Sequence, residues 1–388
     1  MVIERIELEH FRNYEHLQLF PHEKINLFFG RNGSGKTNLL EAIHYCALGK
    51  SHRISQDSYA VMNGEKSGSC ALSVRGRWTR NNLTVTLLPG ESAVKSVSID
   101  QKKVKKLSEM MGVLRCVMFS PEDLNLIKEG PAARRRFLDM MISQLSRSYF
   151  IALQQYRIAM DQRNAILRNS RIEMRPIDPM IEDFEVAMAE HAWIIYQERK
   201  KYTDQIEQKS LQLYRKISGQ EDEHFLVQYR GFLKSETAQK DVFRGMLEMN
   251  RNEDLKQGVT TAGPHRDDLQ LSLNRKNMKL FASQGQMRTA ALSLKLSQLQ
   301  IITEESGESP VLLLDDVMSE LDLKRRMNLL TEIGSTQTFI TFSDEGDLEE
   351  SQFHRTYYVF SNNGVGQIEE KKTGPETNQL IIKEPDFS

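Results

Sequence analysis

The chain has little cysteine and lacks long apolar segments, and these two absences already restrict its class. Its 388 residues include only three cysteines, at positions 46, 70 and 116, and no C-x-x-C pair. This usage is typical of the reduced cytosol and argues against both a disulfide framework and a zinc site. No apolar run approaches the ~20 residues that cross a bilayer, and the acidic first residues argue against a signal peptide. We therefore expect a cytoplasmic protein that does not associate with membranes.

The chain also lacks an excess of charge of either sign. It has 52 basic and 53 acidic residues, for a formal net charge of −1. Net charge therefore predicts no partner, and any nucleic-acid binding must come from a local patch. Internal repeats and low-complexity tracts are absent from the sequence. Its length allows two or three domains with a sizeable core.

What the chain does have is a glycine-rich phosphate loop with the pattern G-x-x-x-x-G-K-[ST]. The loop follows an apolar strand pattern at 25–29 and precedes a helical pattern at 38–48, which is the context that the motif requires. Its glycines let backbone N–H groups face phosphate oxygens. Lys36 is predicted to bind the β- and γ-phosphates of ATP, and the Thr37 hydroxyl to bind Mg²⁺. The loop consists of Gly30, Arg31, Asn32, Gly33, Ser34, Gly35, Lys36 and Thr37.

Two further segments complete the predicted nucleotide site. Four apolar residues at 311–314 precede Asp315 and Asp316, so a buried strand is expected to end in two carboxylates. We predict that Asp315 binds Mg²⁺ and that Asp316 orients or deprotonates the attacking water. A polar turn at Ser283–Gln286 stands before a helix pattern at 287–303. Its members Ser283, Gly285 and Gln286 are predicted to bind the γ-phosphate held by an opposite subunit, so that two copies share each site.

The remaining pattern predicts an α/β fold with an inserted helical domain. Residues 69–99 alternate like an antiparallel meander, whereas 131–169 and 181–213 repeat like an antiparallel helical hairpin. A short strand at 225–229 and a helix at 241–249 are expected to complete the insert. We predict a discontinuous ATPase domain at 1–120 and 258–370, a helical insert at 121–257 and a loosely ordered tail at 371–388.

These motifs, in this order, resemble the head domains of the ABC and SMC class of ATPases. Two long segments narrow the resemblance to the bacterial RecF family. The first joins Ser120–Leu124, Gly130-Pro131 and Arg134–Asp139, and the second is Thr261–Leu269. The opening Phe11–Tyr14 fits as well, and the resemblance covers almost the whole chain.

The resemblance implies a recombination mediator that binds double-stranded DNA near single-strand gaps and junctions. It implies a homodimer when ATP is bound, and a weak, DNA-dependent ATPase that acts as a switch. RecR, RecO and RecA are the implied partners, with RecA loading as the outcome. The family pattern also places Arg12 and Asn13 near the adenine or the phosphates.

Two other functions stay open, namely the ATP-hydrolysing subunit of a transporter and an architectural SMC-like chromosome protein. The chain departs from the broad ABC pattern in two places. It has no histidine after the last core strand, where Thr341 is the candidate substitute. The glutamine loop has no clear equivalent, and Gln56 is the nearest candidate.

Several charged segments have both a functional and a structural interpretation. Residues 131–180 hold nine arginines against four acids. Arg134, Arg135 and Arg136 either contact DNA phosphates or belong to a solvated helix face. The lysines near 102–106 are solubilising or bind DNA, and Ser319–Asp322 is a helix cap or a loop that signals across the dimer. For His265–Asp268 we favour a structural, hydrogen-bonded turn over a metal or catalytic site.

Overall fold

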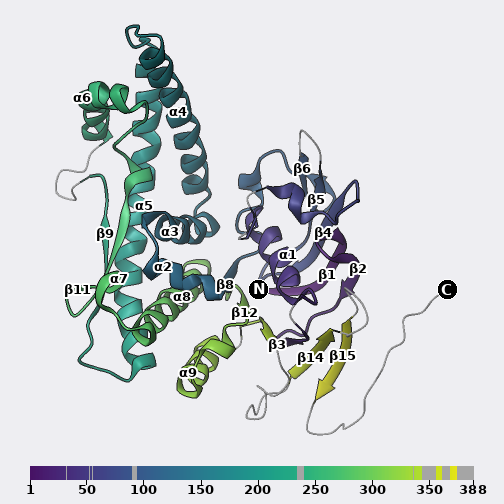
Figure 1. Cartoon of the computed structure of the whole chain (residues 1–388). Helices are drawn as coiled ribbons and strands as arrows, with labels where there is room; N and C mark the ends of the chain where they lie inside the picture. The colour runs from purple at the N-terminus through teal and green to yellow at the C-terminus, as the bar shows by residue number, and fades with distance from the viewer. Residues whose placement is uncertain are drawn as a thin grey trace. The chain divides into compact units, whose positions relative to one another are not determined.

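The computed structural model describes residues 1–31, 33–51, 53–54, 56–89, 94–233, 240–334, 336–342, 355–360 and 368–373. The chain forms two compact units (Figure 1). Unit 1 comprises Met1–Asp123 and Gln298–Ser388, and unit 2 comprises Leu124–Ser297. The expected second boundary near residue 258 differs from this division, because 258–297 belong to unit 2. Of the expected tail at 371–388, only 371–373 lie within the described residues, as the end of a strand.

Unit 1 contains a six-stranded antiparallel sheet in the order β2-β1-β4-β5-β6-β7. The predicted meander at 69–99 is confirmed as β4, β5 and β6. Alternate side chains such as Cys70, Leu72 and Val74 are buried on one face, as period-two patterning requires. The strands are β1 Val2–Phe11, β2 Tyr14–Leu19, β4 Gly68–Arg75, β5 Arg80–Leu88, β6 Val94–Ile99 and β7 Lys102–Lys103.

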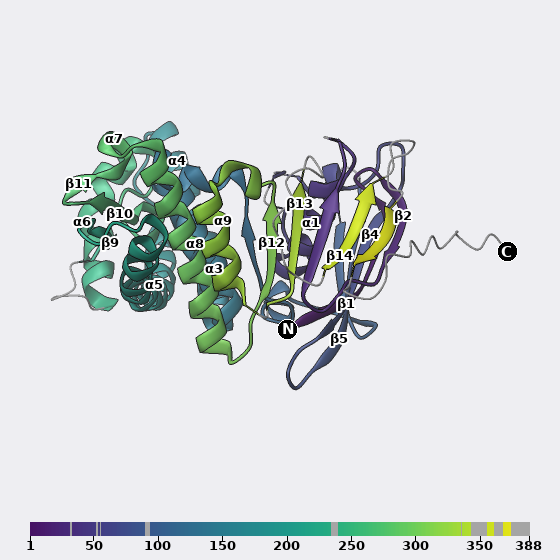
Figure 2. The ribbon, with the colours of Figure 1, turned by 90° about the horizontal axis from the view of Figure 1, so that it is seen from below.

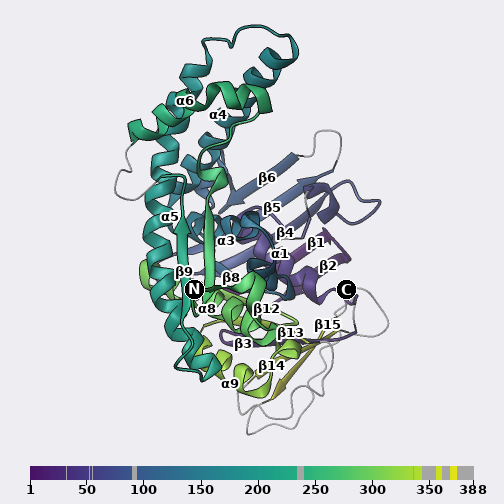
Figure 3. The same cartoon turned by 60° about the vertical axis from the view of Figure 1, so that its left-hand side comes forward.

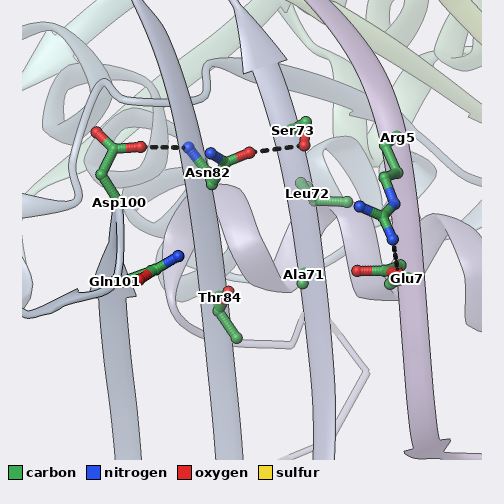
Figure 4. A pocket seen from close by; sticks show the side chains of 9 residues that line it. All are labelled: Arg5, Glu7, Ala71, Leu72, Ser73, Asn82, Thr84, Asp100 and Gln101. Atoms are coloured by element: carbon green, nitrogen blue, oxygen red, sulfur yellow. Dashed lines mark hydrogen bonds and ion pairs between the residues drawn. The ribbon is translucent and has the colours of Figure 1, made fainter.

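The other face of this sheet is polar and carries a shallow pocket of about 400 Å³ (Figure 4). The Ser73 hydroxyl donates to Asn82 Oδ1 at 2.7 Å, and the Asn82 N–H donates to Asp100 Oδ1 at 2.8 Å. Arg5 and Glu7 of β1 form an ion pair beside them. The pocket therefore lies on the face opposite the apolar core and is separate from the phosphate loop.

The second sheet of unit 1 has the order β15-β14-β3-β13-β12-β8. All neighbours are parallel except β15, which runs antiparallel to β14. The short apolar β12 is buried throughout, as expected of a strand inside a parallel sheet. Figure 2 shows β12 and β13 side by side. The strands are β3 Ile25–Phe29, β8 Cys116–Phe119, β12 Val311–Asp315, β13 Thr338–Phe342, β14 Arg355–Phe360 and β15 Ile368–Thr373.

Helix α1 (Lys36–Leu48) joins the two sheets of unit 1, because it contacts strands of both. Its residues Leu39, Leu40, Ile43 and Tyr45 are fully buried in one apolar core that both sheets share. This helix begins directly at the phosphate loop, so the core fixes the position of the loop. Unit 1 also contains η1 Asp57–Ala60, η2 Leu107–Glu109, η6 Met318–Glu320 and α9 Leu323–Ile333.

Unit 2 is mainly helical, with a three-stranded sheet in the order β11-β10-β9. Figures 1 and 3 show α4 and α5 side by side along most of their length. Helix α8 begins in unit 2, and the unit boundary falls after its residue Ser297. The elements are α2 Asn125–Lys128, α3 Pro131–Leu145, α4 Arg147–Ile172, α5 Ile181–Ser218, β9 Phe225–Arg230, α6 Lys240–Gln257, η5 Pro264–Arg266, β10 Asp268–Leu273, β11 Lys276–Asn277, α7 Met278–Phe281 and α8 Gln284–Ser306. A short turn, η3 Pro121–Leu124, precedes α2.

The structure corrects the predicted hairpin in one respect. The segment 131–169 is two helices, because the chain turns at Ser146, where the backbone is extended. The Ser146 hydroxyl accepts a hydrogen bond from the Tyr149 N–H and so caps α4. The second arm is confirmed as α5, which ends at Gly219 in the left-handed conformation. The predicted strand at 225–229 is confirmed as β9, and the predicted helix at 241–249 is part of the longer α6.

A fully buried arginine ties three parts of unit 2 together. Arg163 of α4 has no exposed surface. Its guanidinium donates to Asp254 of α6 at 2.7 Å, to Glu185 of α5 at 3.1 Å and to the Thr260 hydroxyl at 2.9 Å. Paired burial of this kind keeps every charge compensated. The network thereby fixes the positions of α4, α5 and α6 within the unit.

We expect Arg163→Met to destabilise the protein by about 3–5 kcal/mol, because the change leaves two buried carboxylates without their common partner. The matched control is Arg168→Met, since Arg168 is exposed on the same helix and surface changes cost little. Urea unfolding of both variants beside the unaltered protein measures the difference. Equal unfolding midpoints for the two variants would show that the buried network contributes no stability.

Candidate nucleotide-binding site

The phosphate loop connects β3 to α1 and has a backbone that only glycine adopts easily. Gly33 and Gly35 have φ angles of 86° and 114°, in the left-handed region where side chains are strained. At Gly35 an added Cβ would also lie 2.7 Å from Asn13 Nδ2 and 2.9 Å from the Tyr14 hydroxyl. Asn32 of the predicted loop lies outside the described residues. The path of the loop therefore depends both on its local conformation and on close contact with Asn13 and Tyr14.

Lys36 is the cation of this site, and its ammonium group faces the loop. Nζ donates to the carbonyl oxygens of Gly30 at 2.5 Å and Arg31 at 3.0 Å. Burial lowers the pKa of Lys36, while the negative charges of Asp316 and Asp315 oppose that change. A partly desolvated ammonium group inside a glycine loop is suited to bind an incoming phosphate.

Asp315 lies beside Thr37, although the two residues are far apart in sequence. The Thr37 hydroxyl donates to Asp315 Oδ1 at 2.8 Å, and the Thr341 hydroxyl donates to the same oxygen at 2.9 Å. Burial raises the pKa of Asp315, while these two hydroxyl hydrogen bonds lower it. A hydroxyl and a carboxylate are oxygen ligands of the kind that Mg²⁺ prefers. The donor set therefore fits a Mg²⁺ ion held by Thr37 and Asp315 together with nucleotide phosphates.

Asp316 follows in an unusual backbone conformation. Its φ angle is 53°, which is uncommon for a residue other than glycine. Its N–H donates to the Thr341 hydroxyl at 2.9 Å, and its carbonyl oxygen accepts from the Ser319 hydroxyl at 2.7 Å. Thr341, expected to replace the missing histidine, thus contacts both aspartates. The adjoining residues 343 and 344 lie outside the described part of the chain.

Asn13 lies next to the phosphate loop, whereas the neighbouring Arg12 contacts helix α1. Asn13 Nδ2 donates to the Ser34 carbonyl at 3.3 Å. The Arg12 guanidinium instead donates twice to the fully buried Glu41 of α1, at 2.8 and 3.0 Å. Sequence reasoning missed Glu41, for which the only signal is that it is the one acidic residue of α1. Gln56 is exposed just before η1.

Ser283 directly precedes helix α8 in unit 2 and is exposed. Its hydroxyl accepts from the Gln286 N–H at 3.2 Å, while Gln286 Oε1 accepts from the Ser283 N–H at 2.9 Å. This reciprocal pair is a capping box, so the helix starts earlier than the predicted Met287. The Gln286 amide also donates to Glu223 at 2.7 Å, a contact that sequence reasoning did not foresee. The segment is thus a rigid helix N-terminus with an exposed hydroxyl.

Arg134, one of the predicted DNA contacts, is bound inside unit 2. Arg134 is buried and donates to both carboxylate oxygens of Asp268, at 2.7 and 2.9 Å. Arg135 donates to the Asp267 carbonyl at 2.6 Å, whereas Arg136 is exposed. These arginines follow the Gly130-Pro131 start of α3, whose inner face packs into unit 2.

The His265–Asp268 segment has the structural role that we favoured, inside unit 2. The buried Asp267 accepts from Arg199 at 2.8 Å and from the Phe232 N–H at 2.8 Å. His265 Nδ1 lies 2.8 Å from the Tyr156 hydroxyl, and burial lowers the pKa of His265. Among the described residues, no group of three or more acidic, histidine or cysteine side chains could hold a metal ion.

A phosphate loop, an aspartate at the end of a nearby parallel strand and an antiparallel sheet across the loop helix define an ATPase head of the ABC and SMC class. Comparison with known proteins agrees. The family model described as RecF/RecN/SMC N terminal domain matches residues 2–367. RecF of Clostridium perfringens strain SM101, a DNA replication and repair protein, is 38% identical over 369 residues, which cover 95% of this chain and 98% of the relative.

Solved structures give the same result. A structure of the recombination mediator RecF with ATP, from the RecFOR pathway, is 32% identical, with a TM-score of 0.86 over 95% of this chain and 97% of that one. An Smc head domain from Pyrococcus furiosus, at 15% identity and a TM-score of 0.55, shares the fold. The chain belongs to the RecF family. This membership favours DNA repair over the transporter and architectural alternatives.

In the part of the chain that the structure describes, no helix combines the length and apolar character needed to cross a membrane.

Proposed function

We propose that this chain is an ATP-dependent, DNA-binding recombination mediator. The observation that carries the proposal is the cluster at the phosphate loop. There the hydroxyl groups of Thr37 and Thr341 both donate to Oδ1 of Asp315. ATP would bind through the loop N–H groups and Lys36, and Mg²⁺ through Thr37 and Asp315. When bound, the ion would neutralise phosphate charge. Asp316 would orient or deprotonate water for slow, DNA-dependent hydrolysis.

The two halves of the working site would come from two copies of the chain. Ser283, the Gly285 N–H and Gln286 form a rigid helix start whose hydroxyl is exposed. A helix N-terminus attracts an anion such as a γ-phosphate. ATP would therefore join two protomers, and hydrolysis would release them, which makes ATP a switch. RecR and RecO would act with the dimer at single-strand gaps to help RecA load.

Exposed arginines of unit 2 are better candidates for duplex contact than Arg134, whose guanidinium is already bound to Asp268. Arg136, Arg147, Arg157 and Arg168 are exposed on α3 and α4. The last three are about three turns apart along α4, so they lie near one side of the helix. Guanidinium groups bind phosphate oxygens without regard to sequence, as a protein that works at any gap requires.

The solution mass of the purified protein tests the proposal, measured with ATP, ADP or no nucleotide, each with and without a gapped duplex. We expect dimers only with ATP, and more of them when the gapped duplex is present. A monomer under every condition would contradict the shared site.

We predict that Ser283→Arg keeps ATP binding unchanged and prevents the ATP-dependent dimer, because a long cation would occupy the space of the partner's phosphate. The matched control is Ser218→Arg, at the half-buried last residue of α5, which should dimerise normally. Light scattering and equilibrium ATP binding measure the two effects separately. An ATP dimer of normal strength in Ser283→Arg would exclude this helix start from the interface.

A further inference from the structure

The hairpin that joins β4 and β5 exposes a tryptophan at its tip. The Gly76 N–H donates to the Thr79 carbonyl at 2.8 Å, so Arg77 and Trp78 form the turn. Trp78 is 85% exposed. Large aromatic side chains usually bury most of their surface, and an exposed aromatic residue at a protruding turn is well placed to contact a partner.

The turn is held in one conformation by the rest of unit 1. An added Cβ at Gly76 would lie 2.9 Å from the Thr79 hydroxyl. The Arg77 N–H donates to Glu308 Oε2 at 2.9 Å. At the base of the hairpin, Arg75 and Arg80 both bind Glu4. A preorganised turn loses little freedom when it binds, so its side chains can contribute fully to affinity.

Charge around the tip identifies the kind of partner. Glu4 neutralises Arg75 and Arg80 at the base of the hairpin. Arg77 differs, because no carboxylate of the described residues forms an ion pair with its guanidinium. Its guanidinium carbon instead lies 5.1 Å from the centre of the Trp78 ring, in the range of a cation–π contact. The tip therefore combines one flat aromatic face with one cation that is available to an anion.

We propose that Trp78 and Arg77 form a binding site for a single unpaired nucleotide. The base would stack on the indole ring, and Arg77 would contact the adjoining phosphate. Stacking of bases on aromatic side chains is a general mode of single-strand binding, and it needs no sequence preference. A fully paired duplex offers no free base face inside its stack, so this site would select the single-stranded side of a junction. The inference rests on the proposed DNA-binding function and names the ligand of one further site.

Tryptophan fluorescence gives a direct test, because the chain has only two tryptophans, Trp78 and Trp193. In Trp193→Phe, the remaining emission comes from Trp78 alone. We expect an oligothymidylate to quench this emission on binding, since stacking places a base on the ring. Emission that stays unchanged while the oligonucleotide is bound, as measured by anisotropy, would overturn the proposal.

A matched pair of variants measures the contribution to affinity. For a duplex with a single-stranded overhang, Trp78→Ala should weaken binding by about 5- to 150-fold, the usual effect of one stacked base. Its affinity for a blunt duplex should stay within about twofold. The control is Phe20→Ala, which removes another exposed aromatic side chain (61% exposed) of the same unit and should alter neither affinity. Arg77→Ala should weaken overhang binding and lower its salt slope by about one.

The outcomes separate the two proposals. Equal affinity of Trp78→Ala and the unaltered protein for the overhang substrate would overturn the nucleotide site and leave the duplex-binding function intact. Failure of the unaltered protein to bind either substrate would overturn both. Trp78 is exposed, so its replacement should not affect folding, and unchanged ATP binding by the variant would verify this.

Discussion

We expect Lys36→Ala to abolish measurable ATP binding and to leave the fold unchanged. The ammonium group of Lys36 donates to two loop carbonyls, Gly30 and Arg31, and phosphate oxygens would take their place when ATP binds. A hydrogen bond to a charged group contributes about 1.5–3 kcal/mol, and two such bonds correspond to a loss of roughly 10²-fold or more in affinity. Isothermal titration with ATP measures this loss directly.

The desolvation of Lys36 strengthens this expectation. Burial lowers the pKa of Lys36, so the site holds a cation that has already lost part of its water. Contact with phosphate then compensates the desolvation of the ammonium group, which has already occurred in the folded protein. Charge pairs in partly buried surroundings are also stronger than in water. Alanine removes the cation and leaves a glycine loop with only its N–H groups.

Lys50→Ala is the matched control for this variant. Lys50 is an exposed lysine just after α1, so its replacement removes the same charge from the same unit without touching the loop. Its ATP affinity should equal that of the unaltered protein. If Lys36→Ala and Lys50→Ala bind ATP equally well, the phosphate loop does not bind ATP through Lys36. Circular dichroism of both variants tests that the fold is intact.

The phosphate loop and β12 were predictable because each depends on a short stretch of sequence. Glycine at 33 and 35 is required by the backbone itself, and those two φ angles are indeed positive. Four apolar residues before Asp315 are typical of a short strand buried on both faces, and β12 has this form. The alternation in β4 and β5 is equally local. The conformation of each of these segments depends on its own residues, so the sequence alone predicts the phosphate loop, the strands and their order along the chain.

Whether an individual arginine is buried or exposed could not be predicted from local sequence. Arg134 and Arg136 are two residues apart, yet the first is buried against Asp268 and the second is exposed. Which side of α3 faces the rest of unit 2 depends on β10, whose residues are more than a hundred positions away. Arg163 is similar, since its partner Asp254 belongs to another helix. Composition therefore overstated the basic surface of this segment.

Long-range hydrogen bonds explain the other omissions. Glu41 lies on α1 and binds Arg12 at the end of β1, and no local pattern links these two positions. Thr341 was considered only as a replacement for histidine, whereas it contacts the carboxylate of Asp315 and the N–H of Asp316. Such contacts follow from strand order in the parallel sheet, in which β13 lies beside β12. Register across a sheet is a tertiary property.

Asp316→Asn is expected to bind ATP normally and to hydrolyse it at least about 10²-fold more slowly, because removal of a general base costs roughly 10²–10⁴-fold. The carboxylate is half-buried, and its backbone is held by Thr341 and Ser319. A non-glycine residue with positive φ is a strained conformation, and such strain is often found at functional sites. Asparagine tolerates this conformation, so the variant changes the chemistry of the side chain and little else.

Slow hydrolysis has a second, measurable consequence. If ATP joins two protomers and its hydrolysis separates them, Asp316→Asn should remain dimeric long after the unaltered protein has returned to monomers. Light scattering after a single addition of ATP follows this lifetime. Asp315→Asn provides the contrast, because it alters the oxygen that accepts from Thr37 and Thr341. That variant should lose Mg²⁺-dependent ATP affinity and form no dimer at all.

The two aspartate variants together show which carboxylate activates water and which one binds the metal ion. A long-lived dimer in Asp316→Asn and none in Asp315→Asn would assign water activation to the first residue and metal binding to the second. Normal hydrolysis by Asp316→Asn would remove it from the chemistry, and its strained backbone would then need another explanation. Loss of ATP binding in both variants would mean that both carboxylates are needed to bind ATP. Both carboxylates interact electrostatically with Lys36.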